Sequence, residues 1–126
     1  MNNAIPLSLA ALVAVGVIVI GSFYLASPER ILGGFGLKPP ASDADTRAWL
    51  RLKGLRDFAC GVLVLTMMLT ADRRSVGIVV LVLAIIPFGD MSIVLASGGS
   101  KARAFSIHGL TCAVLLVAGL LLIHAA

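Results

Sequence analysis

Residues 76–97 read VGIVVLVLAIIPFGDMSIVLAS, an apolar run whose one charged side chain is Asp90. An α-helix rises about 1.5 Å per residue, so a run of this length is enough to cross the roughly 30 Å hydrocarbon layer of a bilayer. The run lacks the alternation of apolar and polar residues that marks the strands of an outer-membrane barrel. It therefore predicts a membrane-spanning helix.

Three further apolar runs of the same kind fill most of the remaining chain, at residues 4–27, 47–71 and 102–124. Of the 126 residues, 60% are hydrophobic and 13% are charged, and the mean hydropathy is +1.07. A soluble domain of this size has too little interior for so many apolar side chains. We expect an all-α integral membrane protein, with residues 1–126 forming a single domain. The short second and third connections predict a four-transmembrane-helix antiparallel bundle.

Basic residues are unevenly divided between the loops, which predicts an orientation. The second loop holds Arg73 and Arg74, whereas the first and third loops and the helix ends beside them hold Arg30, Lys38, Arg47, Arg51, Lys53, Lys101 and Arg103. By the positive-inside rule the first and third loops face the cytoplasm, so both termini lie outside the cytoplasm, in a plasma or inner membrane. Because these charges flank hydrocarbon, we expect the lipid bilayer, and not nucleic acid, as the partner.

The first loop contains the segment PERILGGFGLKPP at residues 28–40. Its glycines permit tight turns among apolar residues, and its Pro pair ends regular structure. Two interpretations are open: a lid that folds back over the helices, or a stretch that lies among the lipid headgroups. Asp43 or Asp45 is expected to cap the next helix.

Ionisable residues occur deep inside the predicted spans, at Arg56, Asp57, Asp90 and His108. At about 1.5 Å per residue they lie roughly 9 to 13 Å from the cytoplasmic edge, hence at nearly one depth. A charge in hydrocarbon costs about 2.5 to 3.5 kcal/mol or more, so such a layer predicts a functional site. Pro87 removes the hydrogen bond to the carbonyl of residue 83, which predicts a kinked helix beside a cavity just before Asp90.

Helical geometry and charge suggest a role for each group. Lys53, Arg56, Asp57 and Cys60 share one arc at about 100° per residue, which should face the bundle interior. We expect Arg56 to pair with Asp57 or Asp90, and the remaining carboxyl and His108 to transfer protons. The sequence thus predicts two groups of site residues: catalytic Asp57, Asp90 and His108, and substrate-binding Arg56, Lys53 and Tyr24.

Two other interpretations of the same residues are open. In the first, the polar groups only hydrogen-bond to one another, and this network fixes the register of the helices without any further function. A metal site of Cys60, Cys112, His108 and an aspartate is conceivable, but no tight ligand motif is present, so no metal and no cofactor are expected.

Several short stretches resemble a known family: Ser27–Arg30, Phe35–Leu37, WLRLKGLRD at 49–57, Gly89–Asp90 and His108. The resemblance is to a family of small four-span membrane proteins of bacteria and fungi, catalogued as a domain of unknown function and distantly similar to DoxX-like proteins. It implies a four-helix architecture with Arg56, Asp57, Asp90 and His108 at the family's polar positions, and it implies no reaction.

The leading functional hypothesis is a protein that binds a small lipophilic ligand in an intramembrane polar pocket near the cytoplasmic side. Acid–base conversion of the isomerase, cyclase or hydrolase type fits the residues, because it needs only placed acids and bases. The alternative is a proton-coupled transporter or channel, which would require a homo-oligomer. A third hypothesis is a non-catalytic membrane subunit or assembly factor, whose small residues pack against a partner.

Overall fold

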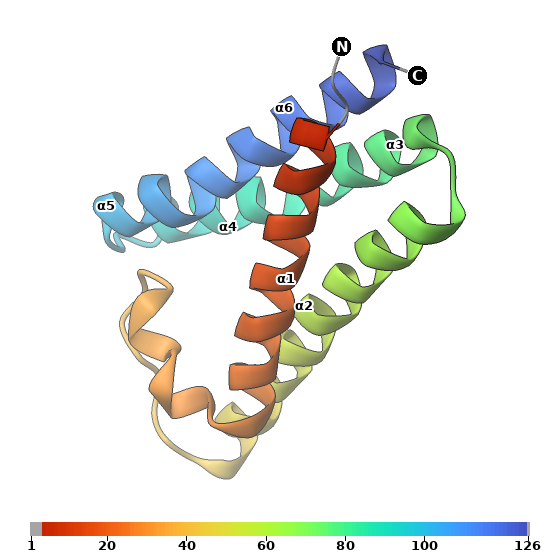
Figure 1. The fold of residues 1–126 in the computed structure, drawn as a ribbon. Helices are drawn as coiled ribbons and strands as arrows, with labels where there is room; N and C mark the ends of the chain where they lie inside the picture. Colours follow the sequence, from red (N-terminus) through yellow and green to blue (C-terminus); the bar gives the residue numbers. More distant parts are fainter. Residues whose placement is uncertain (1–3, 126) are drawn as a thin grey trace.

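The computed structural model describes residues 4–125, and this part of the chain is almost entirely helical (Figure 1). Its helices join end to end into four rods. The first two rods are α1 (Ala4–Ala26) and α2 (Ala44–Thr70). The third joins α3 (Arg73–Leu83) to α4 (Ile85–Ala96), and the fourth joins α5 (Lys101–Arg103), the π-helix η3 (Ala104–Gly109) and α6 (Leu110–His124). The loop after α1 contains two 3-10 turns, η1 (Pro28–Arg30) and η2 (Leu32–Gly34).

Three helical stretches within residues 4–125 are long and apolar enough to cross a membrane: Ala4–Ala26, Arg73–Ala96 and Lys101–His124. They correspond to the first, third and fourth rods and indicate an integral membrane protein. The second rod, α2, has 27 residues and is as long as the others. Lys53, Arg56 and Asp57 interrupt its apolar stretch, so composition alone does not mark it as a span.

The rods pack in two close pairs, α1 on α2 and α3 on α6, and α1 also contacts α6 (Figure 1). Glycines allow both close approaches, because a Cβ on Gly61 would lie 2.5 Å from the carbonyl oxygen of Ala14, and one on Gly77 would lie 2.8 Å from that of Gly119. The buried core fills the space between the pairs and includes Ala10, Ala14, Val64, Val76, Val80, Ala84, Cys112, Leu115, Ala118 and Leu122. From the short turn at residues 71–72, α2 and the rod formed by α3 and α4 diverge (Figure 1).

Aspartates begin the second and third rods. The carboxylate of Asp43 accepts a hydrogen bond from the backbone N–H of Thr46, so of the two expected caps it is Asp43 that begins α2. Asp72 accepts from the backbone N–H and the hydroxyl of Ser75. These hydrogen bonds stabilise the ionised carboxylates and lower the pKa of Asp43 and of Asp72 below the ordinary value.

Regular α-helix is interrupted near the middle of the third rod and near the start of the fourth rod. The third rod breaks at Ala84, one turn before Pro87, whose missing N–H leaves the carbonyl of Leu83 without its helical donor. The predicted interruption is therefore confirmed. The fourth rod widens into the π-helix η3, which contains His108 and which the sequence did not predict. Such π-segments are frequent at functional sites.

Candidate functional site

A cavity of about 310 Å³ lies among α1, α2, α4, the η3–α6 rod and the loop after α1. Most of its wall is hydrocarbon, contributed by residues such as Ala10, Val13, Val17, Leu83, Ile86 and Leu115. The ionisable side chains on its wall, apart from the thiol of Cys60, are Tyr24, Lys53, Asp57, Asp90 and His108. The structure thus brings together five of the six predicted site residues, from four segments that lie far apart in the sequence.

Lys53 is the cation of this site. Its Nζ lies 2.6 Å from Oδ2 of Asp57, one turn along α2, and both side chains are largely shielded from solvent, at 31% and 18% exposure. The same ammonium lies 4.7 Å from the ring centroid of Tyr24 and 5.1 Å from that of Phe35. An ammonium at these distances is attracted by the negative ring faces. Lys53 is therefore held in place by a carboxylate and two aromatic rings.

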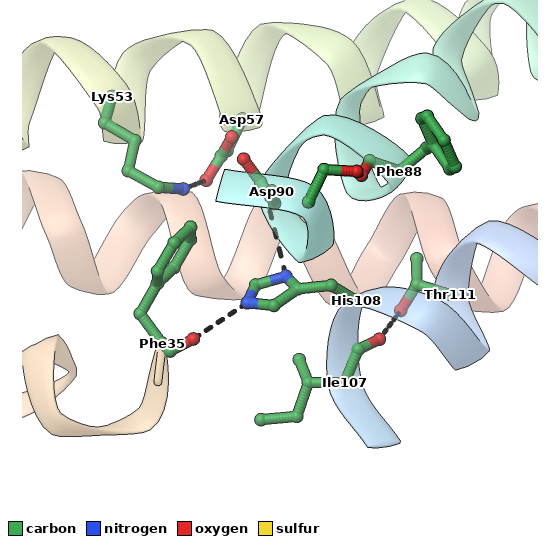
Figure 2. A network of polar contacts seen from close by, with 9 residues as sticks. Phe35, Lys53, Asp57, Phe88, Asp90, Ile107, His108 and Thr111 are labelled. Carbon is green, nitrogen blue, oxygen red and sulfur yellow. Dashed lines mark hydrogen bonds and ion pairs between the residues drawn. The ribbon is translucent and has the colours of Figure 1, made fainter. Parts of the chain in front are cut away.

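His108 is buried and connects the loop to α4 (Figure 2). Its Nε2 lies 2.8 Å from the backbone carbonyl oxygen of Phe35. Because a carbonyl oxygen only accepts, Nε2 carries the proton and donates it. Nδ1 faces Asp90, at 3.8 Å from Oδ2, which is longer than a direct hydrogen bond. In the neutral ring Nδ1 therefore carries no proton, and it faces the carboxylate of Asp90 as a second acceptor.

The two carboxylates of the site come from different helices. Asp57 on α2 and Asp90 on α4 point toward one another, with the bonded Lys53 on one side and His108 on the other (Figure 2). Only Asp57 has a lysine within ion-pair distance. Asp57 and Asp90 are therefore in different surroundings, as general acid–base chemistry with two carboxyl groups requires.

The loop after α1, called the lid below, contributes Ile31, Gly34 and Phe35 to the cavity wall, as the lid interpretation of residues 28–40 expects. Phe35 lines the cavity, and the adjacent Gly36 is buried at a φ of +106°, a conformation that favours glycine. The backbone N–H of Ser100 donates to the carbonyl of Gly36 at 2.8 Å, and the guanidinium of Arg103 donates to that of Gly33. These contacts clamp the lid to the start of the fourth rod.

The prediction that Arg56 faces the bundle interior and pairs with an aspartate is wrong. Its side chain is exposed and is absent from the cavity wall, and the lysine Lys53, not Arg56, pairs with Asp57. At about 100° per residue, Arg56 lies about 60° to one side of Lys53, whereas Cys60 and Asp57 lie within about 40° of it. Arg56 therefore lies at the edge of the arc, and its side chain points away from the cavity.

The cysteines lie in different places. Cys60 lines the cavity, and Cys112 belongs to the apolar core. Both are free thiols. Within residues 4–125, no group of three or more His, Cys, Asp or Glu side chains is arranged to hold a metal ion.

Sequence reasoning missed three contributors to the site: Phe35, Arg103 and the π-turn that carries His108. Phe35 had a usable signal, since it is the one aromatic residue of residues 28–40 and lies between Gly34 and Gly36. The contact of Arg103 with Gly33 joins residues far apart in the chain, and no local pattern encodes it.

Comparison with known proteins gives a family but no activity. A family model described as a domain of unknown function, DUF4267, matches residues 14–122. A search of curated proteins and a search of solved structures give no significant match. The matched range contains all of the polar residues of the cavity wall. The chain belongs to the DUF4267 family, a family of unknown function.

Proposed function

We propose that this protein is an antiparallel four-transmembrane-helix bundle, distantly DoxX-like, that binds a small lipophilic molecule in its cavity and converts it by acid–base chemistry. The observation that carries the proposal is that the cavity wall combines a large apolar part with a small group of polar side chains. Hydrocarbon side chains line most of it, and Tyr24, Lys53, Asp57, Asp90 and His108 supply polar groups. Ligand sites of this kind combine an apolar wall with a few placed polar groups.

The packing of α2 supports a fourth crossing. It lies along α1, which is long and apolar enough to span a membrane. The opposite charges of Lys53 and Asp57 face the cavity as an ion pair, which lowers the cost of placing them at membrane depth. The flexible side chain of Arg56 is free to extend toward the headgroups.

The orientation proposed from the loop charges places the lid and the cavity mouth on the cytoplasmic side of a plasma or inner membrane, with both termini outside. Alkaline phosphatase fused after residue 126 in a bacterial host tests it. We expect an active fusion, because phosphatase folds only outside the cytoplasm. An inactive phosphatase with an active cytoplasmic reporter at the same position contradicts this orientation.

Each polar residue has a proposed role. Asp90 is the base, since it has no lysine within ion-pair distance and faces a free ring nitrogen of His108. Asp90 takes a proton from the substrate and passes it to Nδ1 of His108, 3.8 Å away, and the resulting imidazolium returns the proton to another atom of the substrate as the acid. Asp57 acts mainly through Lys53, which it holds against the aromatic rings; Lys53 and Tyr24 contact the polar group of the substrate. Such proton transfer fits an isomerase, a cyclase or a hydrolase.

The cavity supports this function better than a transport path. Beyond its apolar end lie buried core residues such as Val80, Ala118 and Leu122, and the lid covers the other end. A transporter needs access to the site from both faces. In this arrangement the second face is occupied by packed side chains.

Turnover by purified protein tests the chemistry. The protein is incubated with small lipophilic compounds, isoprenoid and quinone-like molecules among them, and products are detected by mass spectrometry. We expect Asp90→Asn and His108→Gln each to lower the rate at least a hundredfold, as is typical when a general acid or base is lost. Ser92→Ala is the matched control, because Ser92 lies on the same helix, is exposed and bonds only to the carbonyl of Phe88. Equal rates in all three variants contradict the assignment.

A further inference from the structure

We propose that the ligand of this cavity carries an amine head, so that the site selects lipophilic cations over lipophilic carboxylates. This inference rests on the proposed function and names the ligand class of the same site. It differs from the expectation from the sequence that Arg56 binds the substrate, because Arg56 is outside the cavity.

The charges on the cavity wall leave one carboxylate without a directly bonded cation, because the ammonium of Lys53 bonds Asp57 and attracts Asp90 only from farther away. The titratable groups that face the cavity are Tyr24 from α1, Lys53, Asp57 and Cys60 from α2, Asp90 from α4 and His108 from η3. Lys53 and Asp57 neutralise one another at 2.6 Å. The carboxylate of Asp90 lies 3.8 Å from the nearest ring nitrogen of His108, and it accepts no hydrogen bond from residues 4–125. With a neutral histidine, the wall carries one net negative charge.

The hydrogen-bonding groups also match an amine. His108 uses its Nε2 proton on the carbonyl of Phe35, so its Nδ1 is an acceptor, and Asp90 beside it is a second acceptor. An ammonium offers three donors and is able to bond both at once.

A carboxylate head meets the opposite situation. It would enter beside Asp57 and Asp90, whose like charges repel it in a region of low dielectric. Its desolvation would be repaid only by Lys53, which is already paired with Asp57. The site therefore rejects anions through the repulsive element that selective sites require.

The apolar part of the cavity wall determines which ligand tail fits. Between Tyr24 and Ala10, both on the wall, α1 extends about 21 Å. The side chains that α1 places there are aliphatic: Ala10, Val13, Ala14, Val17 and Ile20. An unbranched alkyl chain of moderate length, such as octyl, fits along this side.

A matched series of octylamine, 1-octanol and octanoate tests the inference. The full chain is placed in nanodiscs of zwitterionic lipid, and binding of each radiolabelled compound is measured against empty nanodiscs at neutral pH. We expect octylamine to bind at least tenfold more tightly than octanoate, with octanol between them. The ratio of the two affinities should fall toward one in Asp90→Asn and stay at the wild-type value in Ser92→Ala.

The outcomes separate this inference from the proposed function. Binding of octanoate as tight as that of octylamine in the wild type overturns the ligand class but leaves a lipophilic site. An unchanged preference for octylamine in folded Asp90→Asn also overturns it. If none of the three compounds binds above empty nanodiscs, both the ligand class and the proposed lipophilic site are wrong. The wild-type affinities alone decide the matter if Asp90→Asn does not fold.

Discussion

At the scale of single residues, the site depends on which of two neighbouring basic side chains on α2 turns inward. Lys53 lies one turn before Asp57 and makes the ion pair, whereas Arg56 is adjacent to Asp57 in sequence and points away. Residues four apart on a helix meet on one face, and adjacent residues do not. The identity of the cation in the cavity therefore follows from helical geometry.

Lys53→Met should lower the free energy of unfolding by about 1 to 3 kcal/mol, between the values typical of exposed and of buried ion pairs, because Asp57 keeps its charge and loses its partner. Arg56→Met, the matched control, should change it by less than about 0.5 kcal/mol. Denaturation in mixed detergent micelles measures both. The double variant Lys53→Met/Asp57→Leu should recover most of the loss. Equal effects of Lys53→Met and Arg56→Met contradict the assignment of the pair.

The depth of the polar residues could be predicted from the sequence, but their direction could be predicted only in part. Depth follows from counting residues along a helix, and Asp57, Asp90 and His108 do line one cavity. Direction depends on where neighbouring helices pack, and Arg56 lies only about 60° from Lys53 around the axis. That difference is smaller than the uncertainty of placing a helix face from apolar pattern alone.

At the scale of elements, breaks in regular structure build the site. The third rod breaks at Ala84, η3 widens the fourth rod at His108, and the loop after α1 folds back as a lid. Pro87 made the first break predictable. Neither the π-turn nor the clamp between Gly33 and Arg103 was predicted, and the clamp joins two segments that lie far apart in the chain.

Gly36→Ala should loosen the lid. At a φ of +106° a side chain is strained, and the added Cβ would lie 3.2 Å from side-chain atoms of Val94 and Arg103. Limited proteolysis with trypsin should then cut after Arg30 several times faster than in the wild type. Gly33→Ala is the control, because a Cβ there meets nothing within 4 Å. Identical cleavage of the two variants would show that Gly36 does not hold the lid.

The cap at Asp72 should make stability depend on pH. Its pKa is lowered in the folded state by the two hydrogen bonds from Ser75, so its contribution is present above the unfolded-state pKa and is lost as pH falls through the folded-state pKa. The difference in melting temperature between wild type and Asp72→Ala should therefore narrow in acid. Asp72→Asn, which keeps an acceptor without a titrating charge, should lack this contribution to the pH dependence. A wild-type to Asp72→Ala difference that is constant across pH contradicts the role of the cap.

At the scale of the whole molecule, two helix pairs hold the cavity between them. Close contact in the first pair needs a glycine at position 61, where an added Cβ would lie 2.5 Å from atoms of Ala14 and Ile18. Apolar runs in the sequence predicted the helices. The way the pairs diverge toward the lid (Figure 1) arises from contacts between them, which no single run encodes.

Gly61→Ala should force α1 and α2 apart and lower stability by about 1 to 3 kcal/mol, as overpacking does in other cores. Gly16→Ala, on the facing helix, should leave stability unchanged or raise it by up to about 1 kcal/mol, because a Cβ there meets nothing within 4 Å and alanine favours helix. Thermal unfolding followed by circular dichroism measures both. A Gly61→Ala protein as stable as Gly16→Ala would show that the pair is not closely packed.

Filling the cavity tests most directly whether it binds a small lipophilic molecule. Val17 lines the cavity, whereas Val15 on the same helix is half exposed and lies outside it, so Val17→Trp and Val15→Trp form a matched pair. Native mass spectrometry of purified protein should detect a co-purified small molecule on the wild type and on Val15→Trp, and should find Val17→Trp without it. A bound molecule retained equally by folded Val17→Trp, or none on any of the three proteins, would contradict a ligand in this cavity.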